Sequence, residues 1–168
     1  MILIETVRLI LRNVQMNDAL TMHEYRNHAI CARYQRGQTK DLAGIEKMIC
    51  AHLNDEVSDS ANFILAVEEC CSGKMIGEIV VLPNDGCFSI GYTFHPEFHR
   101  RGYAFEALSV LTDRLHRDYP AMEFISFTDP ENIASMALLK KLGYQDMGYE
   151  PGIHSQVFAK WLQGSDWR

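Results

Sequence analysis

The residues best suited to chemistry lie close together in the stretch FHPEFHRRGYAFEAL, which begins at Phe94. The pattern predicts that a strand ends at Phe94, that a short turn carries His99, Arg100 and Arg101, and that a helix begins at Gly102. The first backbone N–H groups of a helix have no intrahelical acceptors and carry the positive end of its dipole. A glycine there lets an anion approach the backbone closely. The stretch therefore suits phosphate binding, with a solvated arginine loop as the alternative.

Composition limits the kind of ligand. The formal net charge is −6 and the sequence pI is about 5.6. A general nucleic-acid binder needs a broad basic face, so we expect no nucleic-acid partner. An acidic protein with one local basic spot suits a small anionic ligand better.

The chain has 168 residues, which predicts one domain over 1–168. No run approaches the ~20 apolar residues that cross a bilayer, and the N-terminus lacks the basic region and cleavage site of a signal peptide. We therefore expect a cytoplasmic protein with no membrane partner. The five cysteines are odd in number and form no CxxC pair, and the seven histidines show no ligand spacing. We expect reduced thiols and no metal.

The elements that must position the turn follow from hydrophobic periodicity. Short or alternating apolar runs predict seven strands, at 6–14, 63–68, 75–82, 87–94, 122–128, 144–149 and 156–161. Helical spacing predicts helices at 19–26, 42–53, 102–117 and 133–142, and 28–39 is ambiguous. The order predicts an α+β fold in which helices pack on a mixed, mostly antiparallel sheet. The helix at 102–117 is predicted to connect two parallel strands by a right-handed crossover.

A family resemblance rests on three matches in the expected order. The segment His99-Arg100-Arg101-Gly102-Tyr103-Ala104 resembles the Q/R-x-x-G-x-G/A pyrophosphate loop of the GCN5-related N-acetyltransferases (GNAT). The segments at 5–12 and 129–144 are similar to elements of the branch that acetylates ribosomal proteins on alanine or serine. Two departures stand in the loop: His99 replaces the usual Gln or Arg, and Arg100 replaces a frequent Gly.

The resemblance implies a three-layer fold with helices on both faces of the sheet, in which the parallel strands 87–94 and 122–128 splay apart. It implies acetyl-CoA as the co-substrate, with the pantetheine arm lying in that gap. The implied cofactor-binding residues are Tyr92, Thr93, Phe94, His99, Arg100, Arg101, Gly102, Tyr103, Ala104, Phe105, Asn132 and Ser135.

The resemblance also implies direct attack of a neutral amine on the thioester. A backbone N–H near Thr93 or Phe94 is the expected oxyanion donor. Candidates for the general base are Glu78 and His95. The alternatives are a solvent-facing strand residue for Glu78 and a loop cap for His95. Leu139 stands where many relatives carry a tyrosine that acts as the general acid. The residue that protonates the leaving thiolate is therefore unassigned.

The acceptor amine is left open between a protein N-terminus and a small molecule, and a non-catalytic acyl-CoA-binding module is the third reading. We expect the walls of the acceptor site to be formed by residues 16–39 and 148–154. The apolar stretch 158–162 has two interpretations, which are pairing with a second copy in a homodimer and coverage within the chain.

Overall fold

The computed structural model describes residues 1–164. Within them the strands are β1 (Leu3–Glu5), β2 (Leu9–Asn13), β3 (Phe63–Glu69), β4 (Lys74–Asn84), β5 (Cys87–Phe94), β6 (Glu123–Thr128), β7 (Gln145–Glu150) and β8 (Ser155–Lys160). The helices are α1 (Ala19–Asn27), α2 (Ala29–Ala32), α3 (Leu42–His52), α4 (Tyr103–Asp118) and α5 (Ile133–Lys141), with 3₁₀ turns η1 (Met16–Asp18) and η2 (Pro96–Phe98).

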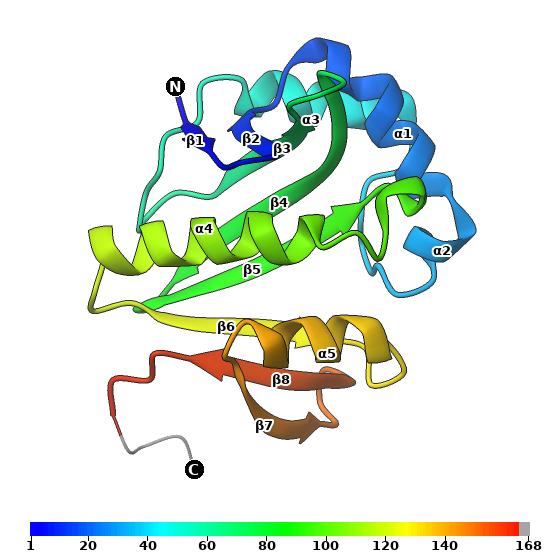
Figure 1. The fold of residues 1–168 in the computed structure, drawn as a ribbon. Coiled ribbons are helices and arrows are strands. Elements are labelled where there is room, and N and C mark those ends of the chain that lie inside the picture. The colour runs from blue at the N-terminus through cyan, green and yellow to red at the C-terminus, as the bar shows by residue number, and fades with distance from the viewer. Residues whose placement is uncertain (165–168) are drawn as a thin grey trace.

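The strands form one mixed sheet in the order β1-β2-β3-β4-β5-β6-β8-β7. Each neighbouring pair is antiparallel except β5 and β6, which are parallel. Helices α4 and α5 cover one face, and α1, α2 and α3 pack on the other face of the N-terminal half (Figure 1). The predicted α+β class with a mostly antiparallel sheet and helices on both faces is confirmed.

The strand count differs from the prediction at the N-terminus. The stretch 6–14 is predicted to be one strand, but β2 begins only at Leu9, and an additional strand, β1, precedes a turn at Thr6. The Thr6 Oγ1 atom accepts the N–H groups of Arg8 (3.3 Å) and Leu9 (2.9 Å), and the Thr6 N–H donates to the Leu9 carbonyl (2.8 Å). The threonine side chain thus closes a hairpin, which brings the sheet from seven strands to eight.

Two apolar clusters hold the helices to the sheet. One joins the inner face of α4, through residues such as Leu108 and Leu111, to the centre of the sheet and to Leu139 of α5. The other joins Tyr25 of α1 and Ile49 of α3 to the opposite face. Tyr144, between α5 and β7, is buried in the first cluster.

The parallel strands separate soon after they meet. Residues Cys87–Ser89 of β5 pair with Glu123–Ile125 of β6, and the pairing stops there. Beyond this point β5 remains paired with β4 up to Phe94, whereas β6 remains paired with β8 up to Thr128. Each strand follows its outer neighbour, so a gap opens between their C-terminal ends (Figure 1). This is the splayed pair that the family resemblance implies.

Strand β8 lies between β6 and β7, so both of its edges are occupied. The alternative in which the stretch after Phe158 pairs edge to edge with a second copy is therefore wrong for β8, and coverage within the chain is correct. Across residues 1–164, we find no helix with the length and apolar character of a membrane span.

Candidate active site

The gap-facing edge of β5 carries backbone groups that have no strand partner. The His95 N–H donates to the Ile76 carbonyl of β4 (2.8 Å). Hydrogen-bonded pairs alternate along an antiparallel ladder, so the backbone groups of Tyr92 and Phe94 point away from β4 and into the gap. The Tyr92 carbonyl accepts a hydrogen bond from Gln35 Nε2 (3.3 Å), and the Phe94 carbonyl contacts His99 Nε2 (2.7 Å). The gap edge therefore offers a short ladder to an extended ligand.

The turn after β5 ends in an exposed helix start. Gly102 has φ +80° and is the N-cap of α4, and its carbonyl accepts the first helical hydrogen bond, from Glu106 (3.0 Å). No described residue accepts the N–H groups of Tyr103, Ala104 or Phe105. Three unpaired donors at the positive end of a 16-residue helix form an anion site.

Arg8, which the site prediction did not include, fixes this helix start from the β1–β2 turn. Its Nη1 donates to the Arg101 carbonyl (2.9 Å), and its Nη2 pairs with the Glu106 carboxylate (2.6 Å). Its guanidinium also lies over the Tyr103 ring, 4.4 Å from the centroid. Burial opposes ionisation of Glu106, but hydrogen bonds from Thr6 and Arg8 hold its pKa below the usual value. Arg8 therefore orients the turn without occupying the N–H groups.

The start of α5 borders the gap on the other side. The Asn132 side chain accepts the Ser135 N–H (3.1 Å) and so caps the helix. The Ser135 hydroxyl is hydrogen bonded to the Tyr92 hydroxyl (2.6 Å). Burial raises the pKa of Tyr92 to about 12, although the hydrogen bond to Ser135 acts in the opposite direction. The predicted residues Asn132 and Ser135 thus lie beside β5, with both side chains engaged within the protein.

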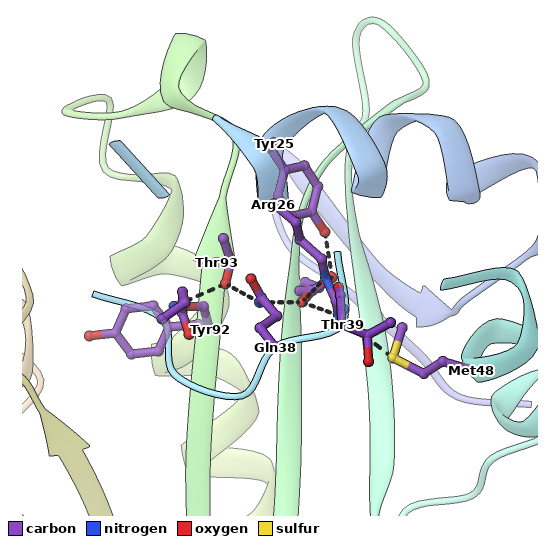
Figure 2. Close-up of polar contacts among 9 residues, drawn as sticks. Tyr25, Arg26, Gln38, Thr39, Met48, Tyr92 and Thr93 are labelled. Atoms are coloured by element: carbon purple, nitrogen blue, oxygen red, sulfur yellow. Dashed lines mark hydrogen bonds and ion pairs between the residues drawn. The ribbon is translucent and has the colours of Figure 1, made fainter. Parts of the chain in front are cut away.

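Glu78 of β4 is buried, with 1% of its surface exposed. The alternative that it faces solvent is therefore wrong. Its carboxylate pairs with Arg26 Nη2 (2.6 Å) and accepts a hydrogen bond from the Tyr25 hydroxyl (2.6 Å). Figure 2 labels Tyr25 and Arg26. Gln38 Nε2 donates to the same group at 3.3 Å. Donors surround both oxygens, an arrangement that suits an anchor better than a base. Burial and the neighbouring Glu78 raise the pKa of Tyr25 well above its usual value.

Residues 33–41 between α2 and α3, which we call the strap, lie across the mouth of the gap. On the β5 side, Gln35 and Gln38 both donate to the Thr93 hydroxyl oxygen, at 3.2 Å each. On the far side, Arg36 pairs with Asp129 after β6 (3.0 Å) and donates to the carbonyls of the β7–β8 turn. The strap therefore places two amide side chains against Thr93 of β5. No motif in the sequence marked them.

His95, the second candidate base, acts as a cap. Its Nδ1 accepts the Glu97 N–H (3.2 Å) at the start of η2, and its Nε2 lies 3.5 Å from the Glu24 carboxylate. The loop-cap alternative for His95 therefore describes the local geometry. His99 is exposed and contacts the Phe94 carbonyl through Nε2. Both ring nitrogens of His95 are thus engaged within the protein.

Two hollows lie beyond the gap itself, and one of them includes Gly102 and Phe105 of the helix start. One, of about 630 Å³, runs between β1 and α4 and begins beside Arg8 and Gly102; we call it the α4 groove. The other, of about 520 Å³, lies where β5 and β6 are still paired, near Cys87 and Glu123. Neither is lined by the gap-facing residues Tyr92–Phe94.

Comparison with known proteins agrees with this geometry. The family model described as an acetyltransferase (GNAT) domain matches residues 8–145. The chain is 28% identical over 151 residues to an uncharacterized N-acetyltransferase, YnaD, of Bacillus subtilis, covering 87% of this chain and 84% of that protein.

Solved structures share the whole fold. A GNAT-family acetyltransferase from Bacillus anthracis superposes with a TM-score of 0.81 at 20% identity, covering 95% of this chain and 98% of that one. A putative ribosomal-protein-serine acetyltransferase from Vibrio cholerae superposes with a TM-score of 0.74 at 22% identity, covering 95% and 97%.

A splayed strand pair beside an anion-binding helix start, together with these matches, defines an acetyl-CoA-dependent acetyltransferase. The chain belongs to the GCN5-related N-acetyltransferase family. The expectations of a single domain, a metal-free site, a cytoplasmic location and no nucleic-acid partner stay predictions, as does the homodimer.

Proposed function

We propose that this enzyme transfers the acetyl group of acetyl-CoA to a primary amine by direct attack. The observation that carries the proposal is the pairing of two features at the ends of one turn. The unpaired edge of β5 ends at Phe94, and the unpaired N–H groups begin at Tyr103. A ligand with an amide-containing arm and a diphosphate engages both.

The predicted cofactor residues take distinct roles in this proposal. The N–H groups of Tyr103, Ala104 and Phe105 bind the diphosphate, and Arg100 and Arg101 add positive charge at the turn. The gap-facing backbone of Tyr92 and Phe94 pairs with the pantetheine amides, and the start of α5 at Asn132 and Ser135 flanks the same arm.

The chemistry requires an uncharged amine and a stabilised oxyanion. The amine nitrogen forms a bond to the thioester carbonyl carbon, the C–S bond breaks, and the CoA thiolate leaves with the bonding electrons. The Phe94 N–H points into the gap and is our candidate for a backbone oxyanion donor. Because donors surround Glu78 and His95 caps η2, we assign removal of the amine proton to water.

The proposed acceptor is a primary amine. Of the two candidate acceptors, we propose a protein N-terminus ahead of a small molecule. The strap and the β7–β8 turn would wall its approach, as Arg36 links these two segments. The Vibrio cholerae neighbour, a putative ribosomal-protein-serine acetyltransferase, supports a protein acceptor. Release of CoA should be measured with peptides carrying free N-termini and with polyamines, amino acids and aminoglycosides. Turnover only with small amines would overturn the protein assignment, and no turnover with any amine would overturn the proposed acetyl acceptor class.

The cofactor site is tested by a charge placed beside it. A ligand at 100 times its Kd stabilises a protein by about 2.7 kcal/mol, which thermal unfolding with CoA detects. Ala104→Glu sets a carboxylate in the first turn of α4, where it suits the helix dipole but repels a diphosphate. We expect it to lose the CoA-induced shift while unfolding at no lower temperature than wild type. The neutral control Ala104→Gln should keep the shift, and equal shifts in both variants would refute the assignment.

A further inference from the structure

The hydroxyl of Thr93 is arranged so that only its proton remains available. Thr93 lies on β5 immediately before Phe94, and 6% of its surface is exposed. A threonine hydroxyl has one proton to donate and two lone pairs that accept. Gln35 Nε2 and Gln38 Nε2 each donate to the Thr93 oxygen at 3.2 Å, so both lone pairs are taken. Figure 2 shows the contact between Gln38 and Thr93.

The orientation of both glutamine amides is fixed by groups that cannot donate. The second N–H of Gln38 reaches the Glu78 carboxylate (3.3 Å), and the second N–H of Gln35 reaches the Tyr92 carbonyl (3.3 Å). Turning either amide around would place oxygen against oxygen. In this orientation the Gln38 Oε1 atom is buried and accepts no hydrogen bond from residues 1–164. The two amides therefore act on Thr93 only as donors.

No acceptor among residues 1–164 takes the Thr93 proton. The nearest charged group, Glu78, lies opposite Thr93 in the β4–β5 register, but Gln38 bridges the two side chains and no direct hydrogen bond joins them. A buried donor without an acceptor carries a cost of about 1–3 kcal/mol. The unpaired Thr93 hydroxyl therefore brings little benefit to the fold by itself. It gains a purpose when a ligand supplies the acceptor.

We propose that the Thr93 hydroxyl is a catalytic oxyanion donor that works together with the Phe94 N–H. This inference rests on the proposed function, which places the thioester beside Phe94. As the amine nitrogen bonds to the carbonyl carbon, negative charge grows on the carbonyl oxygen, and the Thr93 hydroxyl and the Phe94 N–H donate hydrogen bonds to it. Thr93 keeps its proton throughout, the C–S bond breaks, and the thiolate departs. The donor lies on the acceptor face of β5, under the strap.

This role explains the glutamines of the strap. By occupying both lone pairs, Gln35 and Gln38 prevent the hydroxyl from turning its proton elsewhere, which preorganises the donor before the charge develops. The strap is held over β5 by Arg36 from the far side of the gap. Gln35 and Gln38 are therefore positioning residues, because they act through Thr93.

The test compares three proteins. Thr93→Val keeps the shape and removes the proton, whereas Thr93→Ser keeps the proton. Loss of one oxyanion donor lowers kcat by about 10²–10³-fold, so we expect that loss in Thr93→Val with the best amine substrate. We expect Thr93→Ser to stay within about tenfold of wild type. The affinity for CoA, measured by calorimetry, should be unchanged in both variants.

A spectroscopic measurement separates this role from a structural one without any acceptor. In isotope-edited infrared spectra of bound [1-¹³C]acetyl-CoA, a hydroxyl donor lowers the carbonyl stretching frequency. We expect a lower frequency in wild type and Thr93→Ser than in Thr93→Val. Thr93→Val with wild-type kcat and an unchanged frequency would overturn this inference alone. Failure of the wild-type protein to bind CoA would overturn the proposed function instead.

Discussion

The role of the buried Glu78–Arg26 pair can be decided by one substitution. Side-chain exposure is 3% for Arg26 and 1% for Glu78, so Glu78→Gln leaves a guanidinium charge buried without its counter-charge. Breaking a buried ion pair on one side costs about 3–5 kcal/mol. At about 2.1 cal/mol/K per residue, 168 residues have an unfolding entropy of about 0.35 kcal/mol/K, so Tm should fall by about 9–14 °C.

The assay is thermal unfolding combined with steady-state kinetics at a temperature where the variant is folded. We expect kcat to fall less than about tenfold, whereas loss of a general base costs about 10²–10⁴-fold. The double variant Arg26→Met/Glu78→Gln removes the orphan charge and keeps an oxygen for the Tyr25 hydroxyl, so it should regain most of the lost stability. An unchanged Tm with a hundredfold loss of kcat would refute the anchor role and restore Glu78 as the base.

Three further predictions follow from local geometry. Arg100 has φ +61°, which costs a non-glycine residue about 1–2 kcal/mol. After the entropic cost of glycine is subtracted, we expect Arg100→Gly to stabilise the protein by about 1 kcal/mol. A lower free energy of unfolding in urea would contradict backbone strain at Arg100. Arg8→Met should lower stability by about 1 kcal/mol, as the ion pair is partly exposed, and should weaken CoA binding through the turn it holds; an unchanged Kd would contradict that positioning. Burial, with a smaller effect of Glu78, raises the pKa of the Cys31 thiol to about 11, so alkylation at pH 8 should spare Cys31 and modify the exposed Cys50. Because the folded pKa is raised, this thiol's contribution to stability is complete below the unfolded value and is lost as pH rises through about 11; fast alkylation of folded Cys31 would contradict the burial.

The sequence predicted the strand end and helix start around Gly102 well because their signal is local. A strand end, a glycine and a helix start are neighbours in the chain, and Gly102 has the positive φ that close anion approach favours. The same holds for β2, where the alternating residues Leu9 and Leu11 are the buried ones. The N-terminal hairpin was missed because the Thr6 side chain, rather than a glycine or proline, closes its turn.

The acceptor side was not predictable from pattern alone. Glu78 carried no sign that Arg26, 52 positions earlier, would pair with it. Gln38 reaches Thr93 across 55 positions, and an isolated glutamine has no characteristic spacing. Such contacts come from how α1 and the strap pack on the sheet, which only the folded chain specifies.

The central claim is that the first N–H groups of α4 bind the diphosphate of CoA. Titration of ¹⁵N-labelled protein with CoA measures it directly. We predict that the amide resonances of Tyr103, Ala104 and Phe105 shift most, together with the gap-edge amides of Tyr92 and Phe94. Shifts confined to the other hollow, near Cys87 and Glu123, with these five amides unmoved at saturating CoA, would contradict the claim.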